Sequence, residues 1–68
     1  MMLRELKEGE RFIASSTKGQ RNPARFKVMS QPQFNLAAGT ATMICYDETN
    51  KRIVSKQARL EVLKLPLL

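Results

Sequence analysis

The sequence contains no histidine, no tryptophan and only one cysteine, Cys45, among its 68 residues. Histidine is the side chain that most often moves protons in enzymes, and without it Cys45 lacks the usual base that activates a thiol nucleophile. The three glycines stand far apart, so the chain has no glycine-rich phosphate loop. Asp47 and Glu48 are adjacent carboxylates that a turn directs apart into solvent. The sequence therefore predicts a protein that is not an enzyme.

Metal-binding and membrane-spanning classes are also excluded by what is missing. A single cysteine cannot form an internal disulfide, and a chain without histidine lacks the ligand set of a zinc site. We expect Cys45 to be a small buried apolar residue in a reducing compartment. No run approaches the roughly 18 apolar residues that span a bilayer, and the first residues lack the apolar core of a secretory signal. These absences predict a cytoplasmic protein with no metal, no cofactor and no membrane association.

What the chain does have is an ordinary share of hydrophobic residues, 43%, on a very short length. Its 68 residues make one domain, residues 1–68, which buries only about 60% of the surface of its unfolded chain. With neither a disulfide nor a metal to add stability, self-association is the remaining common device for so small a core. A homo-oligomer is therefore among the expectations.

Short segments rich in β-branched and aromatic residues, separated by turn formers, predict strands. Phe26 and Val28 alternate with Arg25, Lys27 and Met29, which is the period-two pattern of a half-buried strand. A polar turn at residues 47–51 connects two strand-like runs into a hairpin. The expected strands are residues 11–16, 24–30, 40–46, 52–55 and 59–65, with a turn at residues 8–9 and a loop at residues 17–23.

Two stretches are ambiguous. Residues 36–38 fit either a short turn or the start of a strand, and residues 55–65 fit either a strand or, by local propensity, a helix. Five short strands in one small chain predict an all-β fold, a small five-stranded, partly open barrel of the SH3-like or OB-like kind. The alternative is an α+β fold in which a C-terminal helix covers a four-stranded sheet.

The positive charge is concentrated in one part of the chain. Twelve lysines and arginines stand against six aspartates and glutamates, a formal net charge of +6. Between Arg11 and Tyr46 there is no carboxylate, and such a basic run is typical of a surface that follows phosphates. The same run also fits a solvated face that keeps a protein soluble. The candidate nucleic-acid-binding residues are Arg11, Lys18, Arg21, Arg25 and Lys27, with Lys51 and Arg52 across the barrel.

Aromatic rings that could stack on bases are few, since the chain has three phenylalanines and one tyrosine. Phe12 and Phe26 are needed in the core, which leaves Phe34 and Tyr46 as the stacking candidates. Core or rim positions are the alternative for both, because so small a domain must bury much of its apolar inventory. The expected core consists of Phe12, Phe26, Val28, Met43, Ile44, Ile53, Leu60 and Val62.

Further apolar residues gather at the two ends of the chain. They either cover each other and close the ends of the barrel or form an interface with another molecule. They are Met1, Met2, Leu3 and Leu6 in front, and Leu63, Leu65, Leu67 and Leu68 behind.

Two functions are compatible with these features. The first is a non-enzymatic module that binds DNA or RNA with low sequence specificity through its basic face. The alternative is a small adaptor or inhibitor that docks on an acidic protein surface, or self-associates, through strand edges and its leucine-rich tail.

Overall fold

The computed structural model describes residues 1–35, 37 and 39–66. These residues form strands and short turns with no α-helix, which confirms the all-β class, and none of their helical turns is long and apolar enough to cross a membrane. In chain order the elements are the 3-10 turn η1 (Leu3–Glu5), β1 (Arg11–Ala14), the 3-10 turn η2 (Ser15–Thr17), β2 (Phe26–Val28), β3 (Gln33–Asn35), β4 (Thr40–Asp47), β5 (Arg52–Gln57) and β6 (Val62–Lys64).

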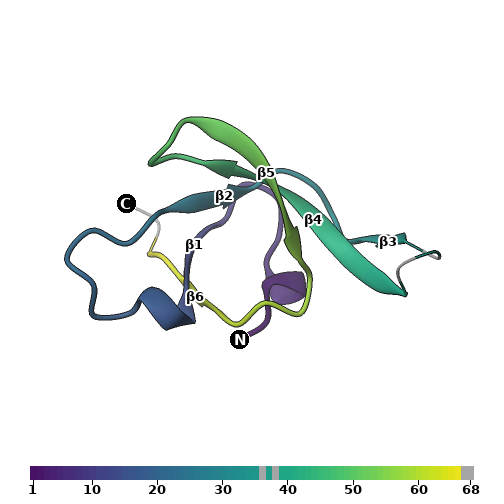
Figure 1. Cartoon of the computed structure of the whole chain (residues 1–68), viewed down its shortest axis with the longest axis horizontal. Helices are drawn as coiled ribbons and strands as arrows, with labels where there is room; N and C mark the ends of the chain where they lie inside the picture. The colour runs from purple at the N-terminus through teal and green to yellow at the C-terminus, as the bar shows by residue number, and fades with distance from the viewer. Residues whose placement is uncertain (36, 38, 67–68) are drawn as a thin grey trace.

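All six strands belong to one antiparallel sheet built around β4, the longest of them. β3 and β2 pair with the first and second parts of β4 along one edge, and β5 pairs along its other edge. Beyond β2, the next strand in the sheet is β1, and β6 lies beside β1 at the edge. The sheet curves strongly, as Figure 1 shows, but its described strands do not close into a barrel, because β5 and β6 do not pair with each other.

The N-terminal segment lies within this curve (Figure 1). The amide of Leu3 donates to the carbonyl of Leu60 at 2.8 Å, and the amide of Arg4 donates to that of Ala58 at 2.8 Å. Leu3 is 0% exposed and Leu6 is also buried, so these two leucines are core residues. The apolar start of the chain therefore covers the interior of the sheet, whereas Leu67 and Leu68 lie outside the described residues.

The core lies on the concave face of the sheet. Burial alternates along β4, with Met43, Cys45 and Asp47 inside, so Ile44 faces the other way. The expectation that Cys45 is buried is confirmed, but the placement of Ile44 and Ile53 in the core is wrong, since Ile53 is 67% exposed. The buried apolar residues are Leu3, Leu6, Phe12, Phe26, Val28, Met43, Cys45, Ala58 and Val62, with Leu60 partly buried against them.

The expected strand boundaries need several corrections. The first strand ends at Ala14 because the chain turns through η2, where the Thr17 hydroxyl donates to the Ala14 carbonyl at 2.7 Å. Of the other expected strands, 24–30 is confined to β2, 40–46 extends to Asp47 in β4, 52–55 extends to Gln57 in β5, and 59–65 is confined to β6. The turn at residues 8–9 is present.

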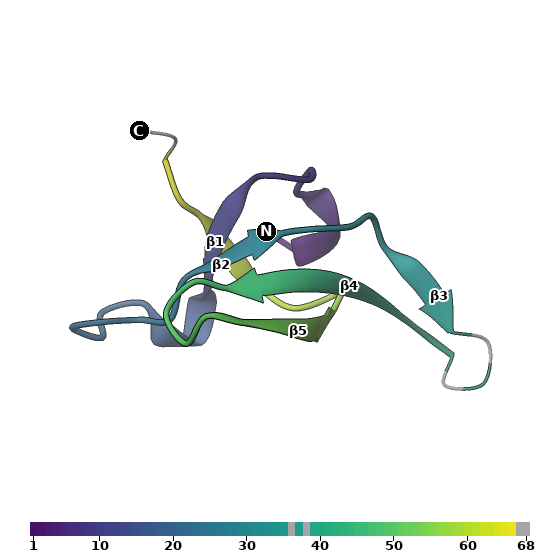
Figure 2. The same ribbon diagram turned by 90° about the horizontal axis from the view of Figure 1, so that it is seen from above.

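Two larger corrections concern the number of strands and the C-terminal segment. The sheet has six strands, because Gln33–Asn35 pairs with Thr40–Thr42 in a hairpin that projects at one end of the molecule (Figure 2). Of the ambiguous residues between these strands, 36 and 38 lie outside the described part of the chain.

The α+β alternative is wrong, since residues 55–65 contain the end of β5, a turn and β6. In this segment the amide of Ala58 donates to the Ala41 carbonyl at 2.9 Å. In a helix the same amide would donate to the carbonyl four residues earlier.

Candidate nucleic-acid interface

Four side chains form a continuous row across the outer, convex face of the sheet. Arg11 of β1 lies directly opposite Lys27 of β2, Lys27 lies opposite Tyr46 of β4, and Tyr46 lies opposite Ile53 of β5. Directly opposed residues in an antiparallel sheet share a face, with Cα atoms about 4.5–5.5 Å apart. The alternation of each strand sets this orientation, because the neighbouring residues Phe12, Phe26, Cys45 and Val54 point toward the core. We call Arg11, Lys27, Tyr46 and Ile53 the outer-face row.

The row contains two cations in direct opposition. Like charges placed opposite each other across two strands are destabilising. Arg11 has one acidic partner, Glu48, whose Oε1 accepts from the Arg11 Nε at 2.7 Å. Lys27 is exposed and forms no ion pair among the described residues. The outer face thus keeps an uncompensated positive charge beside Tyr46.

The remaining candidate cations lie together at one end of the molecule. Figures 1 and 2 both place the loop between η2 and β2 at the same end of the long axis as the β4–β5 turn. Two backbone contacts join them, since the Arg25 amide donates to the Thr49 hydroxyl at 3.0 Å and the Glu48 amide donates to the Arg25 carbonyl at 2.8 Å. The cations of this end cluster are Lys18, Arg21, Arg25, Lys51 and Arg52.

A half-open hollow of about 330 Å³ lies within the end cluster. Two guanidinium groups, a proline and two uncharged polar side chains surround it, and no carboxylate lines it. Such a lining suits an anion, because guanidinium groups recognise phosphate oxygens in a fork geometry. The lining residues are Arg21, Asn22, Pro23, Arg25 and Thr49.

The β4–β5 turn that presents Lys51 and Arg52 is held by Asp47. Its carboxylate accepts from the Thr49 amide at 3.1 Å, the Asn50 amide at 3.0 Å and the Asn50 side-chain amide at 2.9 Å. The side-chain bond from Asn50, followed by the backbone bonds, lowers the pKa of Asp47 below its ordinary value. Lys51 has a φ of 55°, a left-handed conformation that a non-glycine residue seldom adopts. The turn is therefore tightly constrained while its cations stay exposed.

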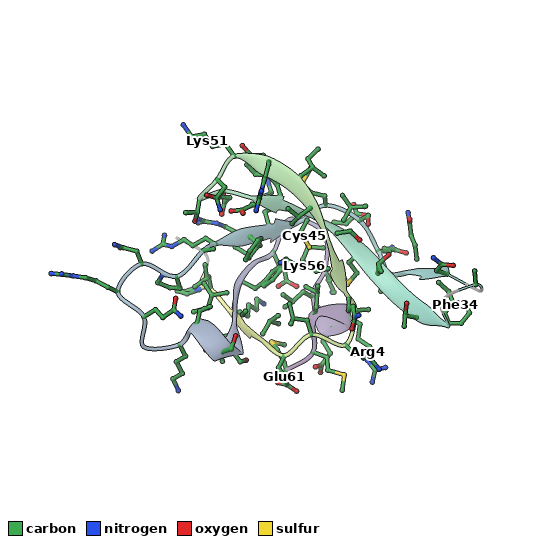
Figure 3. All side chains as sticks on the ribbon, in the orientation of Figure 1. Arg4, Phe34, Cys45, Lys51, Lys56 and Glu61 are labelled. Carbon is green, nitrogen blue, oxygen red and sulfur yellow. The ribbon has the colours of Figure 1, made fainter. Side chains whose placement is uncertain are left out.

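The two stacking candidates are separated by the fold. Tyr46 lies in the outer-face row, next to Lys27. Phe34 lies on the β3–β4 hairpin, and Figure 3 places it at the opposite end of the molecule from Lys51. It is 65% exposed, so the alternative that placed it in the core is wrong. Tyr46 therefore joins the candidate interface and Phe34 does not.

Sequence reasoning missed two outer-face residues, Ile53 and Met29. The sequence pattern predicts Ile53 in the core and gives Met29 no role, yet both are among the exposed large hydrophobic side chains. The sequence carries no signal that separates Ile53 from its apolar neighbour Val54; only the structure shows that Val54 and Lys56 are more buried than Ile53 and Ser55.

Other titratable groups lie away from this face. Burial raises the pKa of the Cys45 thiol, which keeps it protonated at neutral pH. The Lys56 ammonium lies over the Phe26 ring, 4.9 Å from its centroid, and the Lys64 ammonium pairs with Glu10. The Lys64 bond and a backbone bond from Lys7 lower the pKa of Glu10.

Comparison with protein-family models, with curated proteins and with solved structures gives no match. The function must therefore be inferred from the residues of this chain.

Proposed function

We propose that this protein is a non-enzymatic module that binds nucleic acid with low sequence specificity through the outer-face row and the end cluster. The opposition of Arg11 and Lys27 carries the proposal. Like charges in this position repel each other; Glu48 offsets the charge of Arg11, and a bound phosphate would offset that of Lys27. A face whose charges served solubility alone has no need to place them opposite each other.

The end cluster and the row are close enough to act as one surface. Arg25 precedes Lys27 by two positions along the same chain segment, a separation of roughly 6.6 Å in extended backbone. A phosphate in the hollow beside Arg25 and another near Lys27 would therefore be contacts to one continuous backbone. Contacts of this kind position a nucleic acid without reading its sequence, which is why we propose low specificity.

We also propose that the curved sheet is a partly open barrel of the SH3-like or OB-like kind, acting in the cytoplasm. Support for the barrel comes from the curvature and from the N-terminal segment, which bonds to residues 58–62 on the open side of the sheet. Small barrels of the OB kind present a strand face to oligonucleotides, as the outer-face row would here.

Salt dependence of binding tests the proposal. We expect the affinity for labelled DNA or RNA oligonucleotides, measured by fluorescence anisotropy, to fall steeply between about 50 mM and 200 mM salt. The double variant Arg25→Ala/Lys27→Ala should bind more weakly, with a log–log salt slope reduced by about 1.4 to 1.8. An affinity that does not change with salt would overturn the proposal.

A matched control separates this surface from net charge alone. Arg4 and Arg59 are exposed and line a different hollow, beside Pro32 and Ala41. The variant Arg4→Ala/Arg59→Ala loses the same two charges and should keep nearly all of its affinity. Equal weakening by the two double variants would show that net charge, and not the outer-face row, drives binding.

Self-association through β5 is a second candidate. Among the described strands β5 pairs with β4 alone, so its other edge is open, and Ile53 is exposed on it. However, pairing two copies of β5 would bring Arg52 and Lys56 of each copy together, and charged residues on an edge strand oppose such pairing. Light scattering over a range of concentrations tests it, and a constant monomer mass would exclude it.

A further inference from the structure

Apolar side chains lie beside the cations of the outer face. Ile53 is 67% exposed and lies directly opposite Tyr46. Met29, the residue after β2, is 46% exposed, and its amide donates to the Ile44 carbonyl at 2.8 Å, which places it beside Ile44 of β4. Burial alternates along β4, so Ile44 and Tyr46 share the outer face. We call Met29, Ile44, Tyr46 and Ile53 the apolar strip.

The apolar strip fits single-stranded nucleic acid better than a duplex. A duplex keeps its bases stacked inside and presents a charged backbone, so a convex apolar strip would find little to cover it. A single strand exposes base faces, which stack on aromatic side chains while cations follow the phosphates. A surface that has apolar groups and cations in adjacent positions matches the single strand.

We propose that the ligand of the outer face is a single-stranded nucleic acid, with a base stacked on Tyr46 against Ile53 and the neighbouring phosphates on Lys27 and Arg11. The proposal rests on the nucleic-acid-binding function proposed above and narrows it to one substrate class. Neighbouring strands lie about 4.8 Å apart, so the row spans roughly 14 Å from β1 to β5. Lys27 therefore lies within side-chain reach of the backbone of a nucleotide stacked on Tyr46.

The composition of the chain supplies a direct probe. The sequence has one tyrosine and no tryptophan, so the intrinsic tyrosine fluorescence of the wild-type protein comes from Tyr46 alone. The probes are an oligothymidylate of about 12 nucleotides, within the range that single barrels bind, and the duplex it forms with oligoadenylate. We expect the single strand to quench Tyr46 emission, after correction for absorption by the oligonucleotide, and the duplex to leave it nearly unchanged.

Variants separate stacking from charge. Tyr46→Ala should weaken binding of the oligothymidylate about 5- to 150-fold without changing the salt slope, because it removes a stacking platform and no cation. Tyr46→Phe should restore most of the affinity. The matched control is Phe34→Ala, which truncates an exposed aromatic ring at the other end of the molecule and should leave binding unchanged.

Each outcome decides between the proposals. Equal affinity for single strand and duplex, with Tyr46 emission unchanged, overturns this inference and leaves the nucleic-acid-binding function standing. Binding of neither probe overturns both. A dimer that Ile53→Asn dissociates, and that the oligothymidylate does not, shows the strip to be an interface between copies and overturns the inference. If Tyr46→Ala fails to fold, quenching in the wild type and weakened binding by Ile53→Ala remain as the test.

Discussion

The Nε of Arg11 and the Oε1 of Glu48 lie 2.7 Å apart, although 37 positions separate the residues in the chain. The pair joins the start of β1 to the residue after β4, across the line of β2. The Glu48 carboxylate thereby occupies the guanidinium group that the proposed phosphate contact of Arg11 requires. Of the carboxylates in the described part of the chain, it is the one that pairs with a cation of the outer-face row, so its removal has a definite consequence.

We predict that Glu48→Gln raises the affinity for single-stranded oligonucleotides a few-fold. The substitution frees the Arg11 guanidinium for phosphate, and the log–log salt slope should become steeper by about 0.7. Anisotropy titrations at two salt concentrations measure both effects. The control is Glu61→Gln, which changes the net charge equally at an exposed residue far from Lys51 in Figure 3. An equal gain for the two variants would contradict the prediction.

Asp47 makes the stability of the protein depend on pH in the acidic range. Its pKa is lower in the folded state than the ordinary value of 3.8, mainly through the Asn50 side chain. A carboxylate with a lowered folded pKa stabilises the fold above its unfolded pKa, and this contribution is lost as the pH falls through the folded pKa.

We therefore predict that the melting temperature of the wild type falls more steeply below about pH 4 than that of Asp47→Asn. The asparagine still accepts the backbone bonds of the turn but carries no charge to lose. Thermal melts followed by circular dichroism from neutral pH downward measure the difference. Glu10, whose pKa is also lowered, remains in both proteins, so the comparison isolates Asp47. Parallel curves would show that the turn does not depend on this charge.

Leu3→Ala should strongly destabilise the protein, by about 2–5 kcal/mol, because it leaves a cavity in a core with few other large side chains. Cys45 reports the loss, since its thiol is fully buried and reacts with a thiol reagent only when the chain opens. We expect the labelling rate to rise at least tenfold in the variant. The control is Ile53→Ala, an exposed truncation worth less than about 0.5 kcal/mol. Similar labelling rates in the two variants would place Leu3 outside the core.

The sequence predicted most of the sheet because the local pattern and the tertiary environment agree there. Phe26 and Val28 alternate with cations, and both are buried in β2 as the period-two pattern requires. The sequence did not predict β3, because its three residues are all exposed and so give the strand no buried, apolar side. They are held as a strand by the part of β4 that extends beyond its pairing with β2.

The candidate site was predictable in composition but not in arrangement. The run without carboxylates identified Arg11 and Lys27, yet only the register of β1 against β2 brings them into opposition. Ile53 was assigned to the core because hydrophobicity alone does not tell which face of a strand a residue occupies. Pairing of residue 53 with residue 46 settled that it shares the outer face with Tyr46.

The bond between Leu3 and Leu60 links segments from nearly opposite ends of the described chain. Leu3 and Arg4 bond to residues more than 50 positions later in the chain, so the interior of the sheet cannot be covered before residues 58–62 are in place. Contacts of such high sequence separation slow folding, and the waiting chain exposes apolar surface in the meantime. We therefore expect the local hairpins of this protein to form first, and Leu3 and Leu6 to be buried only when residues 58–62 have reached them.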